Sequence, residues 1–186
     1  WANAPRYQHN VDKAKSYLAK VATPPSTLTL TSTNIEPNKT AAQIVQANLK
    51  DVGLDVKLNL LNEGAWTTFM TDNKNVTKEL QLFYGNFTSA PDPFWSIEWF
   101  TCDEVQVWNW MRSCNPAFDR LNKEGTRTLD PGKRTKIYIE MQKLMDQAVD
   151  ANWAIYPTNY FAWRKGVVTP SLSPIGRFMP RAFRPA

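Results

Sequence analysis

The stretch that decides the fold begins with Leu28-Thr-Leu-Thr-Ser-Thr33, continues through residues 38–53, and ends with Leu54-Asp-Val-Lys-Leu-Asn-Leu60. The first and last segments alternate at period two and are rich in strand-forming residues, which predicts two strands. Between them, apolar residues recur at helical spacing, Asn38 can cap the helix and Gly53 can end it. A strand, a helix and a strand in this order predict a parallel pair and an α/β fold.

Further elements are predicted on both sides of this unit. Residues 11–21 and 64–71 have helical patterns, and residues 153–163 are aromatic and β-like. Leu80-Gln-Leu-Phe-Tyr-Gly85 predicts a third strand, and its nearly continuous apolar character indicates a central position. We therefore expect a mixed, mostly parallel sheet flanked by helices.

Three later helices share one predicted start, an Asp or Asn cap followed by proline at the first helical position. The dipeptides are Asp92-Pro93, Asn115-Pro116 and Asp130-Pro131. The third opens the longest predicted helix. Its expected buried face carries Ile137, Met141, Leu144, Met145 and Ala148.

Composition and charge exclude several classes of protein. With 186 residues, 42% hydrophobic and 21% charged, the chain fits one globular domain. Residues 164–186 hold five of the 22 basic residues and none of the 17 acidic ones, so the rest is neutral. Because only a proline-rich tail is basic, we do not expect a nucleic-acid partner. We divide the chain into a lobe of residues 1–166 and a Pro/Arg-rich extended tail of residues 167–186, and we interpret the start at Trp1 as processed or excised.

The sequence contains few of the residues and motifs that catalysis commonly uses. His9 is the single histidine, and neither a phosphate-binding loop nor a hydrolase or metalloprotease motif occurs. We therefore expect no enzyme activity, no cofactor and no metal site. Cys102 and Cys114 have the spacing of neither a zinc site nor a CxxC redox motif. They could form a disulfide, worth about 3 kcal/mol, or remain two buried thiols.

Four tryptophans crowd around the cysteines: Trp95, Trp99, Trp108 and Trp110. Such rings can line a pocket or fill a core, and we expect some to do each. Trp95 and Trp99 share one helix face. If residues 108–110 are extended, neighbouring side chains point in opposite directions, so Asn109 could contact a solute or Trp108 and Trp110 could stack on it.

Several loose motifs follow one another in an order that is specific as a whole. Together they resemble the peptide/nickel-type extracytoplasmic solute-binding proteins of ABC importers, solute-binding family 5. The motifs are Tyr7…Asp12-Lys-Ala…Leu18, Ala41…Leu49…Gly53-Leu-Asp-Val-Lys57, Glu63…Trp66, Ala90-Pro-Asp-Pro93, Cys102…Asn109…Cys114-Asn-Pro-Ala-Phe-Asp119-x-Leu121 and Arg134…Tyr138…Gln142…Met145.

The resemblance implies one lobe, the more C-terminal one, of a two-lobed protein with a type II periplasmic-binding-protein-like fold. Such a protein captures a solute outside the cytoplasm, in the periplasm, and delivers it to an ABC permease in the membrane. The partners implied are a peptide-, opine- or sugar-like solute, the missing N-terminal lobe and the permease. The tail would return to the missing lobe.

One position departs from the family pattern. Peptide-binding members carry an aspartate before the Asp-Pro turn that pairs with the α-amine of the ligand, and Ser89 stands there in this chain. A neutral serine cannot make that charge-assisted hydrogen bond, which makes a free-amine peptide less expected. The full set of candidate ligand contacts is Ser89, Asp92, Trp95, Trp108, Asn109 and Trp110, with Glu63 and Trp66 as weaker candidates.

Two alternatives stay open at this point. Asp92 can be simply a helix cap. The whole chain can also be a free-standing carbohydrate- or partner-binding module that uses exposed tryptophans.

Overall fold

The computed structural model describes residues 7–71, 80–87, 90–105, 107–154, 158, 160–174 and 176–185. The chain divides into two compact units. We call Trp1–Phe87 with Glu104–Arg112 the sheet unit, and Thr88–Asp103 with Ser113–Ala186 the helical unit. The boundary at residue 166 that we expected from composition stays a prediction.

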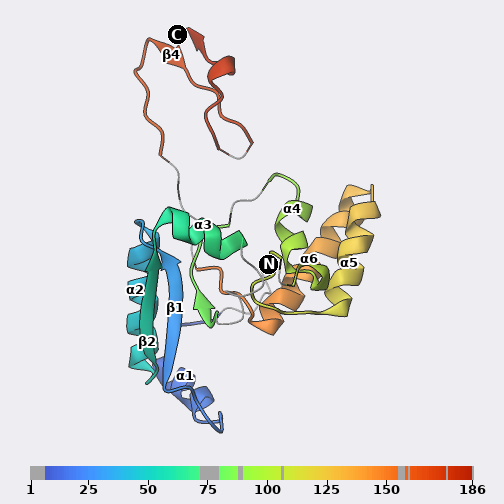
Figure 1. Ribbon diagram of the computed structural model, residues 1–186. Helices are drawn as coiled ribbons and strands as arrows, with labels where there is room; N and C mark the ends of the chain where they lie inside the picture. The colour runs from blue at the N-terminus through green and yellow to red at the C-terminus, as the bar shows by residue number, and fades with distance from the viewer. Residues whose placement is uncertain are drawn as a thin grey trace. The chain divides into compact units, whose positions relative to one another are not determined.

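The sheet unit contains the predicted strand–helix–strand crossover. Its elements are α1 (Val11–Leu18), β1 (Thr27–Thr33), α2 (Asn38–Asp51), β2 (Asp55–Leu61), α3 (Glu63–Thr71) and β3 (Leu82–Phe83). All three strands are parallel, with Leu30 beside Leu58 of β2 and Leu82 of β3 (Figure 1). The predicted parallel pair is therefore confirmed.

The strand order corrects one prediction. The order is β2-β1-β3, so β1 lies in the middle of the described strands and β3 at an edge. The apolar run in residues 80–85 predicted a central strand, but only two of its residues pair with β1, and no described strand lies on its other side. The central strand looked half-polar because its hydroxyls are buried with partners: Ser32 Oγ donates to the Tyr84 carbonyl at 2.9 Å, and Ser32 itself is fully buried.

Helix α2 packs on β1 and β2 through a small apolar core made of Leu30, Ala42 and Val56. The predicted end of this helix is confirmed, since Gly53 has φ +98°, which favours glycine. The predicted cap is wrong. Asn38 is already helical, and its side-chain amide donates to Thr33 Oγ1 at 2.9 Å, tying the start of the helix back to the end of β1.

The helical unit contains α4 (Phe94–Ile97), α5 (Pro116–Arg127) and α6 (Pro131–Ala148), with short 3-10 turns at Glu98–Phe100 and Cys102–Glu104. The predicted starts at Asn115-Pro116 and Asp130-Pro131 are confirmed, whereas α4 begins one residue later than predicted, with Pro93 at the cap position and Asp92 before it. Asn115 accepts from the backbone of Ala117 at 3.0 Å, Asp130 from that of Lys133 at 2.7 Å, and Asp92 from that of Phe94 at 2.9 Å.

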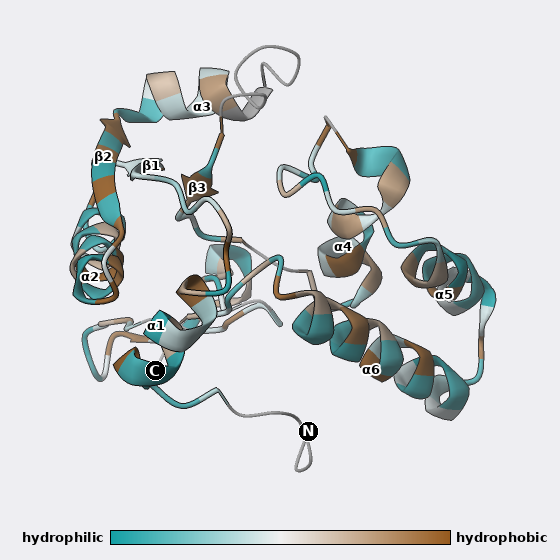
Figure 2. Ribbon diagram, turned by 90° about the horizontal axis from the view of Figure 1, so that it is seen from below, coloured by the Kyte–Doolittle hydropathy of each residue, from teal (hydrophilic) through white to brown (hydrophobic). Residues whose placement is uncertain are grey.

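Helices α5 and α6 lie side by side (Figure 2). Their close approach depends on Gly125, because a Cβ there would lie 3.1 Å from Tyr138 Cζ. The core between these helices and α4 consists of Ile97, Phe118, Ile137, Tyr138 and Met141. The predicted buried face of α6 is thus confirmed at Ile137 and Met141.

The C-terminal part corrects two further predictions. The described residues between 153 and 163 form no strand. The tail is not a plain extended connection, because β4 (Val168–Thr169) and β5 (Arg184–Pro185) pair antiparallel and a 3-10 turn spans Pro180–Ala182. Edge-to-face ring contacts favour this hairpin, with the Phe178 ring 4.6 Å from that of Phe161 and 5.5 Å from that of Phe183.

The cysteines form a disulfide, Cys102–Cys114, which resolves the choice that the sequence left open. Both cysteines belong to the helical unit, whereas residues 104–112 between them belong to the sheet unit. The bridge therefore ties together the two points where the chain leaves the helical unit and returns to it. Among the described helices, none combines the length and the apolar character that a membrane crossing needs.

Candidate functional site: a groove at the carboxyl edge of the sheet

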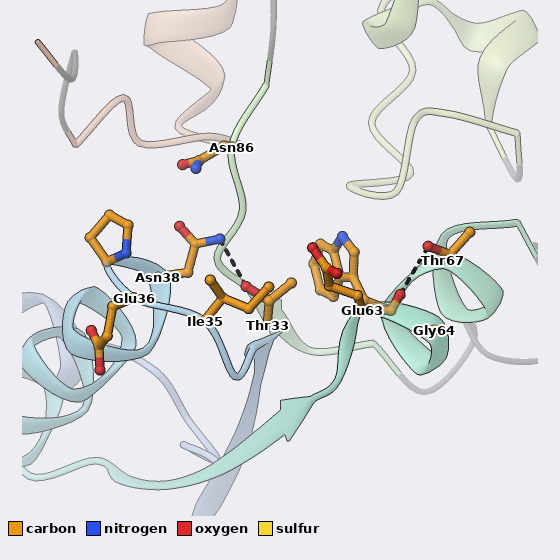
Figure 3. Close-up of a pocket in the computed structure, with 10 residues that line it drawn as sticks. Thr33, Ile35, Glu36, Asn38, Glu63, Gly64, Thr67 and Asn86 are labelled. Carbon is orange, nitrogen blue, oxygen red and sulfur yellow. Dashed lines mark hydrogen bonds between the residues drawn. The ribbon is translucent and has the colours of Figure 1, made fainter. Parts of the chain in front are cut away.

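A groove of about 600 Å³ lies in the sheet unit where the parallel strands end. Strand β1 ends at Thr33, β2 at Leu61 and β3 at Phe83, and the groove is formed by the residues that follow each of them. In open α/β sheets, ligands bind in the crevice outside the carboxyl ends of the strands. The lining residues are Thr33, Ile35, Glu36, Pro37, Asn38, Glu63, Gly64, Trp66, Thr67 and Asn86 (Figure 3).

Two helices begin at this groove and hold its side chains in place. Helix α3 follows β2 directly, and Asn62 caps it by accepting from the Ala65 backbone at 2.8 Å. Glu63 and Gly64 form its first turn, and the Glu63 carbonyl accepts from Thr67 Oγ1 at 2.9 Å. Short connections after the three strands thus place three separate segments of sequence, residues 33–38, residues 63–67 and Asn86, around one cavity.

An indole ring forms an apolar part of the wall. Trp66 stacks on Phe69, with ring centroids 5.8 Å apart and an interplanar angle of 19°. Its Cζ2 would lie 3.2 Å from a Cβ at position 85, so Gly85 gives the ring the space to lie against the chain after β3. The ring is therefore fixed on two sides, as a binding surface of low entropy cost requires.

Polar atoms face the same space. Asn38 directs its amide nitrogen to Thr33, while its Oδ1 is buried and makes no hydrogen bond within the described residues. Asn86 projects toward Asn38 from the chain after β3 (Figure 3). A buried acceptor without a partner costs roughly 1–3 kcal/mol, which a bound donor group would relieve.

Among the described residues, none of those that the sequence singled out most strongly lines this groove. Ser89 is outside the described residues. Asp92 accepts from Arg134 through both carboxylate oxygens, at 2.9 and 2.7 Å, as well as from Phe94. The hydrogen bond from Arg134, followed by that from the Phe94 backbone, lowers the pKa of Asp92. The same pairing raises the pKa of Arg134. Asp92 is thus occupied by the Phe94 backbone and by its ion pair with Arg134, and its role as a ligand contact stays a prediction.

The tryptophans divide, as expected, between exposed and buried positions. Trp95 on α4 is 57% exposed and Trp108 is 41% exposed, whereas Trp110 is 6% exposed. Trp110 packs edge-on against Phe83, with ring centroids 5.5 Å apart, and is a core residue of the sheet unit.

Residues 108–110 are not extended. The predicted alternation of side-chain directions assumed an extended segment, so it does not apply here. The Glu104 carbonyl accepts from the backbones of Val107, Trp108 and Asn109, at 2.9, 3.0 and 2.8 Å, and folds the segment into a turn. Asn109 is fully buried. Contacts of Trp95, Trp108, Asn109 and Trp110 with a solute remain untested, and these residues belong to both units.

Sequence reasoning ranked Glu63 and Trp66 low and missed Asn38 and Asn86 as site residues. The signal that could have found them is positional. Each follows a predicted parallel strand within a few residues, and carboxyl ends of parallel strands share one edge of a sheet.

The fold defines the class of protein. Similar solved structures include the ABC transporter substrate binding protein CtaP from Listeria monocytogenes, with TM-score 0.69 and 21% identity, covering 80% of this chain and 30% of that chain. Another is the periplasmic binding protein DppA from Helicobacter pylori, in complex with the peptide STSA, with TM-score 0.68, 21% identity, and 80% and 29% coverage. The chain has the fold of part of a type II periplasmic binding protein.

The family follows from sequence. Residues 1–106 match the model of the bacterial extracellular solute-binding proteins, family 5, middle region, so the chain belongs to this family. Two relatives from Pseudomonas aeruginosa (strain UCBPP-PA14) are Di/tripeptide-binding protein 1, 26% identical over 75% of this chain, and Probable di/tripeptide-binding protein 5, 28% identical over 93%. The chain spans about a quarter to a third of the length of these relatives, at 26% and 33%.

Proposed function

We propose that this chain forms one wall of the solute cleft of an extracytoplasmic receptor that serves an ABC importer. The observation that carries the proposal is the groove at the carboxyl edge of β1, β2 and β3. Its volume of about 600 Å³ falls within the usual range of small-molecule sites. It combines one fixed indole ring with a few polar groups, as such sites commonly do.

The proposed solute is a small peptide or a peptide-like compound. Support comes from the relatives, which are named for binding di- and tripeptides, and from the solved complex with the peptide STSA. Backbone amides of a peptide would offer donors to Asn38 Oδ1 and both donors and acceptors to Asn86. The Ser89 departure concerns only one charged contact and leaves the rest of a peptide free to bind.

The mechanism we propose is capture without chemistry. The groove is open on one side, so a second lobe would complete the cleft, and closure of the two lobes would exclude water from the solute. Delivery to a permease in the membrane and a location outside the cytoplasm belong to the same proposal. Among the described residues, no group of three or more His, Cys, Asp or Glu side chains could hold a metal ion.

The test is calorimetry on the full-length receptor with a set of di- and tripeptides, comparing wild type with Trp66→Ala. We expect one-to-one binding that weakens by about tenfold or more in the variant, since fixed aromatic contacts carry much of a binding energy. An unchanged affinity would contradict the groove as the solute site. Trp108→Ala is the matched control, because Trp108 is exposed and does not line the groove.

A free-standing binding module is the second candidate function. The observation that favours it is the exposure of single tryptophans, with Trp95 at 57%, Trp153 at 49% and Trp163 at 56%. Such a module would bind an oligosaccharide tightly by itself. Tight one-to-one binding of a sugar by this 186-residue chain, abolished by Trp95→Ala, would favour the module over the receptor wall.

A further inference from the structure

The charges of the groove all have one sign. Glu36 and Glu63 are its ionisable lining residues, and no Lys, Arg or His lines it among the described residues. A cavity with carboxylates and without cations favours a positively charged group in the solute.

The two carboxylates differ in what they do. Glu36 accepts from both the backbone and the hydroxyl of Thr40, and its side chain points away from the cavity (Figure 3). Glu63 lines the groove from the start of α3, across from Asn38 (Figure 3). Within the described residues its carboxylate makes neither a hydrogen bond nor an ion pair, so it is available to a solute.

Helix dipoles do not cancel this charge. Helices α2 and α3 both begin at the groove, and each helix start carries roughly half a positive unit charge. Two carboxylates against two such ends leave a net charge of about minus one. Glu36 already compensates α2, because it accepts from the first-turn backbone of Thr40. The remaining negative charge is therefore centred on Glu63.

The neighbouring ring suits the same kind of group. Trp66 lies three residues after Glu63 on α3, so both side chains rise from one side of the helix. An indole face attracts a cation through its quadrupole, more strongly than Tyr or Phe does. Asn38 Oδ1, buried and without a hydrogen bond among the described residues, adds an acceptor for an N–H donor.

We infer that the groove binds a cationic nitrogen group of the solute, an ammonium or a guanidinium, with Glu63 as its counter-charge and Trp66 as the ring beside it. This inference rests on the proposed function and names the chemistry of the solute.

The test is an NMR titration of the full-length receptor that follows the indole N–H of Trp66. Three probes are used, all as C-terminal amides: Ala-Ala, N-acetyl-Ala-Ala, and N-acetyl-Ala-Lys, which carry an α-ammonium, no charge, and a side-chain ammonium. We expect at least one cationic probe to bind better than N-acetyl-Ala-Ala, and Glu63→Gln to weaken that probe by about tenfold while leaving the neutral probe unchanged. The probe that binds better identifies the source of the cation.

A matched control separates binding from helix stability. Asp12 is the acid in the first turn of α1, so Asp12→Asn removes a helix-start charge away from the groove. We expect it to leave all three probes unchanged, and Glu63→Asp to retain most of the preference. Equal binding of the cationic and neutral probes, or no effect of Glu63→Gln, would overturn the inference alone. If no probe shifts any groove residue, the proposed function fails as well.

Discussion

The carboxylates of Asp92 and Glu63 differ in whether another group of the protein bonds to them, and this difference decides what each can do. Asp92 in the helical unit is held by Arg134 and by the backbone of Phe94, and these bonds lower its pKa. Glu63 in the sheet unit starts a helix too, but its carboxylate faces a groove and makes no such bond within the described residues. The same chemical group thus serves structure at one site and remains available for binding at the other.

The surroundings explain the difference. Arg134 is itself fixed by its Nε bond to the Gly125 carbonyl at 3.1 Å and by a contact with the Tyr138 hydroxyl at 3.2 Å, so the ion pair belongs to the α5–α6 core. The groove side chains come instead from segments that follow strands. Changes in the first region should therefore alter stability, and changes in the second should alter binding.

The largest effect on stability should come from the disulfide in the helical unit. We expect replacement of Cys102 and Cys114 by serine to lower the free energy of unfolding by about 3 kcal/mol, because the open chain gains conformational freedom. Urea denaturation measures this loss. Wild type with a reductant should match the double variant, and a loss well under about 1 kcal/mol would show that the bridge adds little.

The second-largest effect on stability should come from the ion pair between Arg134 and Asp92. Arg134→Met removes two bonds to Asp92 and those to Gly125 and Tyr138, so we expect a melting temperature several degrees lower. Lys143→Met is the control, since Lys143 and Glu140 form an exposed pair, at 58% and 52%, and exposed pairs contribute little. Equal changes in both variants, measured by circular dichroism, would contradict a structural role for Asp92.

The pH dependence of folding stability should reveal the same ion pair between Arg134 and Asp92. Since the folded-state pKa of Asp92 lies below its ordinary value of 3.8, its contribution is complete above that value and is lost as the pH falls through the lowered pKa. The stability difference between wild type and Arg134→Met should therefore shrink below pH 3.8. A difference that stays constant in acid would contradict the ion pair as its cause.

The smallest effect on stability should come from the groove. A Cβ at Gly85 would lie 3.2 Å from the Trp66 ring, so Gly85→Ala should displace the indole by a few tenths of an ångström. We expect a change in unfolding free energy below about 1 kcal/mol, together with a shift in the Trp66 indole N–H resonance and weaker solute binding. A large loss of stability would place the ring in the core rather than in a binding wall.

The sequence predicted local structure better than the site. Period-two and helical spacing identified β1, α2 and β2, and Asp-Pro or Asn-Pro pairs identified three helix starts, because these are short-range signals. The place of β3 depends on which strands pair, and the turn after Glu104 depends on three backbone bonds to one carbonyl. Neither is encoded in a local pattern.

The site itself depended on what the sheet brings together. Asn38, Glu63 and Asn86 are far apart in sequence and meet only because the three strands are parallel and end at one edge. The tryptophan cluster attracted attention because its residues are close in sequence, yet Trp110 is core and Asp92 is paired. Contacts of the tryptophan cluster with a solute stay a prediction, while the groove brings together residues that are distant along the chain.

The most direct test of the central claim is to map, by backbone and indole NMR shifts in the full-length receptor, where Ala-Ala or its N-acetyl form binds. The groove predicts that the largest shifts occur at Gly64, Trp66 and Asn86 and are reduced by Trp66→Ala. Shifts centred on Trp95 or Trp108, with Gly64, Trp66 and Asn86 unaffected, would contradict the account.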